Sequence, residues 1–319
     1  MKKYTHAWLA FMAIKRLQDS KLSADDRRYA DSLIGWFMDH RDDVIQGAWY
    51  PDAVIKDMAT SHVLKLALSA TSTMKYKTLP PSYLSLEYGQ ASPAKARSFT
   101  IDTSTNLPDR CESIAHSVID DLKLQQHESK GSPVSPTNNH IALLLFMLSH
   151  YVADGHMPLH CDARAFSKGI DLHSRIEGEW EDAVEAYYRT DKPNERFLYD
   201  PDGYPLKNSR KEQAYQSSVL AKASAALDQR QFDVSWGRDN KNVWDFMSAI
   251  CQYSYLLSYC FIPEKYDWKD VTAADWQSLG TLRFEDFSVA VLADAIDSVA
   301  RVWLRVWRRY MKWEKEQDA

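Results

Sequence analysis

The chain has 319 residues, of which 45% are apolar and 26% charged, with 11 Trp and 17 Tyr. This composition predicts a packed globular core and excludes a disordered chain. The formal net charge of -5 excludes a general electrostatic attraction to nucleic acid or to anionic membranes, so a polyanion would have to be bound by local features such as metal ions.

The first segment that needs interpretation is the apolar stretch 4–14, which follows two lysines as a secretory leader would. His6 interrupts this stretch, a basic pair follows it, and no small-residue cleavage site is present. We therefore interpret residues 6–18 as an amphipathic helix of the mature protein. Residues 25–40 carry apolar side chains at helical spacing and predict a second helix.

Further helices are predicted wherever apolar side chains recur at helical spacing: residues 54–69, 111–126, 138–157, 172–188, 213–227, 243–261 and 287–313. Two polar stretches that are rich in turn-forming residues, 77–110 and 189–212, predict long surface loops. Because strand signals are few, we expect an all-α protein whose single domain spans residues 1–319.

The sequence predicts no membrane span, because no run of 18 apolar residues occurs. The cysteines are scattered and lack CxxC spacing: Cys111, Cys161, Cys251 and Cys260. They predict neither a disulfide framework nor a cysteine zinc site, and they fit a reducing compartment. We therefore expect a cytoplasmic location.

Histidines and carboxylates gather in the segments SHYVADGHMPLH and LHSRIE. His150 and Asp154 are four residues apart, so a helix places both side chains on one face. His160 follows a helix-ending proline, and His173 and Glu177 repeat the spacing of four. Zinc accepts imidazole nitrogen and carboxylate oxygen, and a catalytic zinc keeps one position for water. These residues therefore predict a metal centre.

Two upstream segments offer further ligands. The segment GAWYPDAV contains Asp52, and His62 lies ten residues later. His6 is close enough in sequence for its imidazole to approach the amino group of Met1.

Taken together, these motifs resemble the bacterial zinc-dependent phospholipase C family and the related fungal and plant single-strand-specific zinc nucleases, which also act as 3'-nucleotidases. The resemblance covers residues 1–177, and the C-terminal helix is similar to the last helix of the family. It implies a multi-helix domain with a trinuclear metal cleft, up to three Zn²⁺ ions as cofactors, and a hydrolase of phosphate esters.

The resemblance also implies a ligand set for each zinc ion. The first ion would be bound by Asp52, His62, His150 and Asp154. The second would be bound by His160, His173 and Glu177. The third would be bound by the amine and carbonyl of Met1, by His6, and by Asp154 as a bridging carboxylate. Two closely spaced ions would activate the attacking water, the third would offset charge on the phosphate, and Asp52 would orient that water or accept its proton.

Two positions depart from the family pattern, and a third distinguishes its phospholipases from its nucleases. Met1 stands where the mature family proteins begin with Trp, and Met157 replaces a Gln before the proline. Glu177 is a feature of the phospholipases, since the nucleases usually have Asp. We therefore favour a phospholipase C-like activity on a lipid head group.

Two alternatives remain open. The first is a nuclease or 3'-nucleotidase that acts on single-stranded nucleic acid or 3'-nucleotides, with the loops 77–110 and 189–212 deciding the substrate. The second is a non-catalytic binding module with structural metals, although structural zinc sites are normally closed, cysteine-rich and single. The remaining histidines are expected not to be ligands: His40, His116, His127, His140 and His156.

Overall fold

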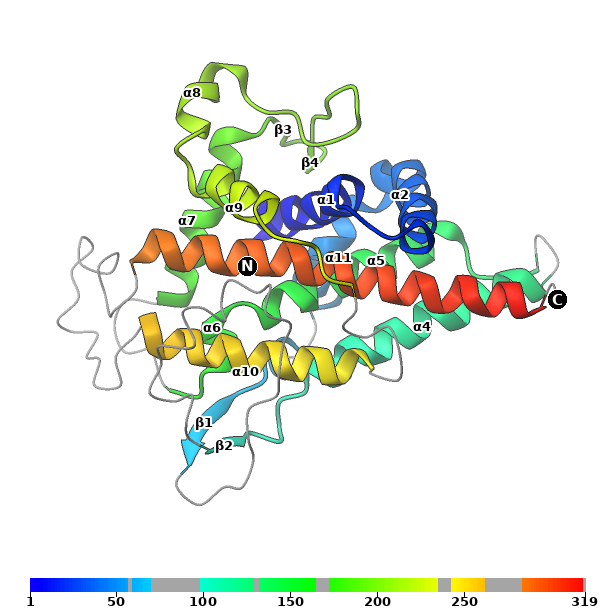
Figure 1. Ribbon diagram of the computed structural model, residues 1–319, viewed down its shortest axis with the longest axis horizontal. Helices are drawn as coiled ribbons and strands as arrows, with labels where there is room; N and C mark the ends of the chain where they lie inside the picture. Colours follow the sequence, from blue (N-terminus) through cyan, green and yellow to red (C-terminus); the bar gives the residue numbers. More distant parts are fainter. Residues whose placement is uncertain are drawn as a thin grey trace.

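The computed structural model describes residues 1–56, 59–69, 98–128, 132–164, 172–234, 242–261 and 283–317. These residues are mostly helical, which confirms the predicted all-α class (Figure 1). The helices are α1 (Lys3–Asp19), α2 (Ala24–Val44), α4 (Leu107–His127), α5 (Asn138–Gly155), α6 (Pro158–Cys161), α7 (Leu172–Tyr187), α8 (Glu212–Tyr215), α9 (Val219–Asp228), α10 (Val243–Phe261) and α11 (Phe284–Gln317). No described helix has both the length and the hydropathy to cross a membrane.

Helix α5 is the centre of the packing. It contacts α1, α2, α4 and α11, and every residue from Phe146 to Gly155 is buried. The helix begins where expected, because Thr137 Oγ1 accepts a hydrogen bond from the backbone N–H of His140 at 3.2 Å. Pro158 then starts the short helix α6. The buried half of α5 is the half that carries His150 and Asp154.

Helix α1 lies alongside the long helix α11, which crosses the middle of Figure 1. Our expectation of an amphipathic helix here is wrong. Trp8, Leu9, Ala10 and Phe11 are consecutive and all buried, so α1 presents apolar side chains on every side. The reason is that α1 is enclosed by α2, α5, α7 and α11 rather than lying on a surface.

The predicted helix 54–69 is also wrong. Its residues lie partly in a π-helical turn (Pro51–Ile55) and a 3-10 turn (Ala59–His62), and then in strand β1 (Leu66–Ser69), which pairs antiparallel with β2 (Ser98–Ile101). A short apolar run does not distinguish a helix from a strand, and here the partner strand decides.

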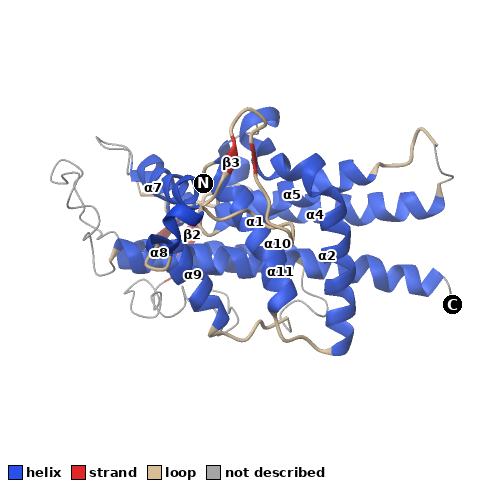
Figure 2. Cartoon of the chain, turned by 90° about the horizontal axis from the view of Figure 1, so that it is seen from above, coloured by secondary structure: helices blue, strands red, loops and turns tan. Residues whose placement is uncertain are grey.

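The predicted surface loops contain regular structure. Of the loop 77–110, residues 77–97 lie outside the described residues, whereas β2 and the start of α4 occupy part of the remainder. The loop 189–212 contains β3 (Thr190–Asp191) paired with β4 (Arg196–Phe197), and it folds over α1, where the Tyr204 hydroxyl donates to Gln18. Figure 2 shows how little strand the described residues contain.

The predicted helix 213–227 is divided into α8 and α9. Ser218 separates them, because its Oγ accepts from the backbone N–H of Ala221 at 3.2 Å and so caps α9.

Candidate metal centre

The structure brings the predicted ligands together from six separate elements. These elements are α1 together with Met1 ahead of it, the turns Pro51–Ile55 and Ala59–His62, α5, α6 and α7. Three groups of described residues have ligand atoms close enough to hold a metal ion. The groups are His62, His150 and Asp154; His160, His173 and Glu177; and His6, Asp52 and His150.

The first group is centred on Asp154 Oδ2. This oxygen lies 2.9 Å from His62 Nδ1 and 3.2 Å from His150 Nε2, and the two nitrogens are 3.2 Å apart. Asp52 Oδ1 is 3.8 Å from each of these two nitrogens. The four residues that the resemblance assigns to one ion therefore converge on a common point.

The second group joins α6 to α7. His173 Nε2 lies 2.7 Å from Glu177 Oε1, and His160 Nε2 lies 2.8 Å from His173 Nε2 and 3.9 Å from the same carboxylate oxygen. The spacing of four residues on α7 places His173 and Glu177 on one face, as the sequence predicts.

The Met1 amine lies between two carboxylates. It is 2.5 Å from Glu177 Oε1 and 3.5 Å from Asp154 Oδ1, and it is fully buried. His6 Nε2 and His160 Nδ1 approach that same Asp154 Oδ1 to 3.6 Å and 3.7 Å. The two oxygens of Asp154 thus face two different sets of donors.

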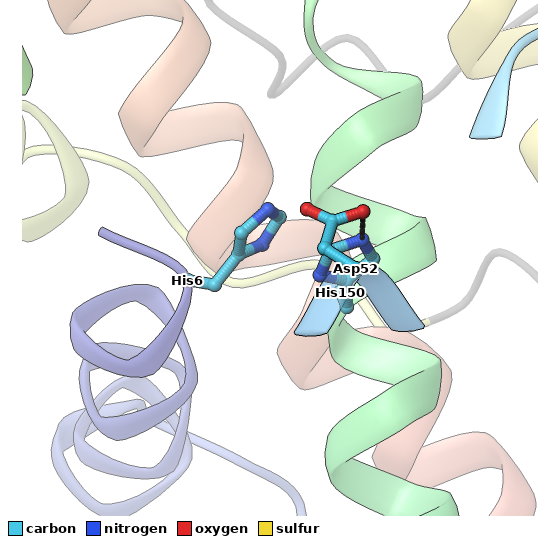
Figure 3. A group of neighbouring side chains, drawn as sticks. All are labelled: His6, Asp52 and His150. Carbon is cyan, nitrogen blue, oxygen red and sulfur yellow. Dashed lines mark ion pairs between the residues drawn. The ribbon is translucent and has the colours of Figure 1, made fainter. Parts of the chain in front are cut away.

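His6 also belongs to a second neighbourhood, which Figure 3 shows. Its ring stacks on that of His150 with centroids 3.9 Å apart, and the two histidines form a possible ligand group with Asp52. Asp52 is at the edge of the centre, because 36% of its side chain is exposed.

Buried histidine nitrogens that lack a hydrogen-bond partner indicate whether the site suits a metal ion. Both ring nitrogens of His6 and Nδ1 of His160 are buried and have no hydrogen-bond partner among the described residues. A buried polar atom without a partner carries a free-energy cost. Ligands about 2.0–2.2 Å from a tetrahedral zinc ion lie about 3.3–3.6 Å apart. His6 Nε2 and His160 Nδ1 lie at nearly this separation from Asp154 Oδ1, at 3.6 Å and 3.7 Å. The residues therefore fit a bound cation.

For His6, His160 and Asp154, the electrostatics give the protonation states that metal binding requires. Burial lowers the pKa of His160 to about 3, and burial together with His150 holds the pKa of His6 well below its usual value. Both imidazoles are therefore neutral at pH 7 and have a free lone pair. Burial also opposes ionisation of Asp154, but His150 and the Met1 ammonium outweigh it and hold the pKa of that carboxyl well below its usual range.

The carboxylates in turn affect the amine. Burial opposes the charge of Met1, but Glu177 and Asp154 raise its pKa to about 10. At the rim, burial raises the pKa of Asp52, and the nearby Asp154 adds to this effect although His150 opposes it. The amine is therefore the cation that neutralises Glu177 and Asp154 in this arrangement.

Groups outside the ligand set hold two of the histidines in place. His150 Nδ1 donates to the carbonyl of Ala48 at 2.9 Å, which leaves Nε2 as the lone-pair nitrogen that faces Asp154. The Lys65 ammonium donates to the carbonyls of Leu159 and Asp162 at 2.5 Å and 3.1 Å, on either side of His160. Sequence reasoning missed both, since a backbone carbonyl has no signature and Lys65 lies far from α6 in the chain.

Of the histidines expected not to be ligands, four have other neighbours. His116 pairs with Glu112 at 2.9 Å, and His140 with Asp121 at 3.3 Å. The rings of His40 and His127 contact aromatic side chains.

His156 is buried, and its Nε2 lies 2.7 Å from the hydroxyl of Ser298. None of the three possible ligand groups includes it.

A wide cavity of 1240 Å³ lies elsewhere, between the C-terminal half of α1, residues 200–216 and α9. Its lining includes as many basic as acidic side chains, and it includes no predicted ligand. Size alone would favour this cavity as the functional site. We favour the metal centre, because its buried donors converge and are partly unsatisfied.

Comparison with known proteins adds no assignment. No protein-family model matches the chain, and no curated protein matches its sequence.

Proposed function

We propose that this protein is a zinc-dependent hydrolase of phosphate esters, with an activity like that of phospholipase C. The observation that carries the proposal is Asp154, whose Oδ2 faces His62 and His150 while Oδ1 faces Met1, His6 and His160. A carboxylate shared in this way suits a bridge between neighbouring cations.

The donor set supports zinc as the metal. It combines imidazole nitrogens with carboxylate oxygens, and none of the three groups of described residues includes a cysteine. Structural zinc sites are usually closed and rich in cysteine, whereas catalytic sites use His and Asp or Glu and stay open. The exposed rim at Asp52 therefore favours catalysis over a purely structural metal.

Bound zinc ions would supply Lewis acidity, which acidifies water and offsets the charge of a phosphate ester. The protein would supply orientation and proton transfer. The Asp52 carboxylate stands at the solvent edge, where it can accept a hydrogen bond from the attacking water and then its proton. The Ala48 carbonyl holds the ring of His150, so the geometry beneath Asp52 is fixed before substrate arrives.

A second candidate is a single-strand nuclease or 3'-nucleotidase. Trp49 is half-buried beside the centre, with its ring 6.1 Å from that of His6 and 6.3 Å from that of His150. A base can stack on such a ring. Glu177 remains the reason to favour the lipid head group.

The proposal is tested by parallel assays of the purified protein on a short-chain phosphatidylcholine, on single-stranded DNA and on 3'-AMP. Each assay is run with a chelator, and again after zinc is restored. We expect chelator-sensitive release of phosphocholine. Cleavage of DNA or 3'-AMP alone would assign the second candidate, and metal binding without turnover of any substrate would favour a structural role.

A further inference from the structure

Glu181 of α7 contacts the start of α1, although it belongs to none of the three possible ligand groups. Its carboxylate accepts hydrogen bonds from the backbone N–H groups of Tyr4 and Thr5 at 2.9 Å and 2.8 Å, and from the Thr5 hydroxyl at 2.8 Å. All three donors belong to the first turn of α1.

This contact replaces a local cap. The first N–H groups of a helix have no partner within the helix, and a nearby carboxylate also interacts favourably with the helix dipole. Lys2, the N-cap residue, makes no side-chain capping bond, and the first turn of α1 contains no acidic residue. Glu181 therefore caps α1 from a different helix.

The position of Glu181 links this cap to the metal centre. His173, Glu177 and Glu181 follow one another at intervals of four on α7, so they share one face. The first two belong to a possible ligand group, and Glu177 also contacts the Met1 amine. Helix α7 is itself fixed to α11, because Trp180 Nε1 donates to the Ser288 hydroxyl at 2.8 Å.

We propose that Glu181 is a positioning residue, which holds the start of α1 so that the Met1 amine and His6 face Asp154 and Glu177. As a statement about metal binding, this rests on the proposed function. As a statement about the docking of the N-terminus, it can be tested separately.

The test compares Glu181→Ala and Glu181→Gln with the matched control Glu185→Gln, which changes the exposed glutamate one turn further along α7. The proteins are produced with a free amine at Met1 and freed of metal. The first measurement is the rate at which an acylating reagent modifies that amine, read by peptide mass spectrometry. The second is zinc per chain after reloading, and circular dichroism checks the fold.

Loss of a helix cap should raise the rate of acylation about tenfold in Glu181→Ala. Zinc content should fall by about one equivalent in that variant, while the control matches the wild type. Glu181→Gln retains one acceptor oxygen and should lie between the two. Should Glu181→Ala fail to fold, Glu181→Gln and Thr5→Val, which removes the hydroxyl donor, provide the same comparison.

Unchanged acylation in folded Glu181 variants would overturn the proposal. A wild-type protein that binds no zinc would refute the metal centre, whereas the contrast in acylation would still decide whether Glu181 docks the N-terminus.

Discussion

The Nε2 atoms of His160 and His173 lie 2.8 Å apart, and both face Glu177 Oε1. Only one hydrogen can lie between two ring nitrogens at this distance, so one nitrogen directs its lone pair at the other. A cation between them would use both lone pairs and the carboxylate together. Removing one of the two imidazoles should therefore lower the amount of metal bound per chain.

Replacing His160 by Ala should remove about one equivalent of metal from a protein that holds about two to three, together with most of its activity. Elemental analysis of protein purified without chelator measures the first effect. His116→Ala, at an exposed histidine that pairs with Glu112, is the control. Less than half an equivalent in the wild type would contradict the existence of the centre.

The substitution Asp52→Asn should lower kcat by about 10²–10⁴-fold with little change in KM. The amide keeps the shape of the side chain, but it cannot accept a proton from water. Steady-state kinetics on the best substrate checks this. A variant with normal turnover would show that Asp52 has no role in the chemistry.

Lys65→Met should weaken metal binding at His160 and His173. Met keeps much of the side-chain stem but leaves the carbonyls of Leu159 and Asp162 without their donor, at a cost to stability of about 1–3 kcal/mol. Zinc affinity from chelator competition should fall about tenfold, since loss of an outer partner typically costs this much. Lys222→Met, which breaks an exposed ion pair with Glu285, should leave affinity unchanged.

Alkaline pH should destabilise the protein through Tyr188. Burial raises the pKa of this phenol, and its neighbour Tyr215, whose hydroxyl is 3.2 Å away, adds to the effect. Because the folded pKa lies above the unfolded value of about 10, the contribution to stability is complete below about pH 10 and is lost as the pH rises further. Urea unfolding of wild type and Tyr188→Phe on both sides of pH 10 measures this. The variant should lose less of its free energy of unfolding, and parallel losses would contradict the assignment.

The sequence could predict those ligands of the site that lie near one another in the chain at helical spacing. A spacing of four residues places two side chains on the same face of a helix. This spacing separates His150 from Asp154 and His173 from Glu177, and both pairs do lie on helices, α5 and α7. Glu181 continues that spacing, so its place on the ligand face of α7 was open to prediction, although its bond to α1 was not.

The part that sequence could not predict depends on partners distant in the chain. Residues 66–69 are apolar enough for a helix, and only their pairing with residues 98–101 makes them a strand. The carbonyl of Ala48 orients His150 across 102 positions, and any residue type would offer the same carbonyl. Such contacts leave no mark in composition or spacing.

Because α1 is apolar on every side, it also determines when during synthesis Met1 and His6 can join the candidate metal centre. The helix packs along α11, where Arg16 Nε donates to Asp297 Oδ1 at 2.7 Å, so two segments from opposite ends of the sequence are packed together (Figure 1). A nascent chain on the ribosome therefore exposes α1 until residues 284–317 emerge, and contacts of such long sequence separation form late. His6 and the Met1 amine therefore reach their places only after residues 284–317 have emerged, and a metal ion that needs both of them as ligands would bind only after that step.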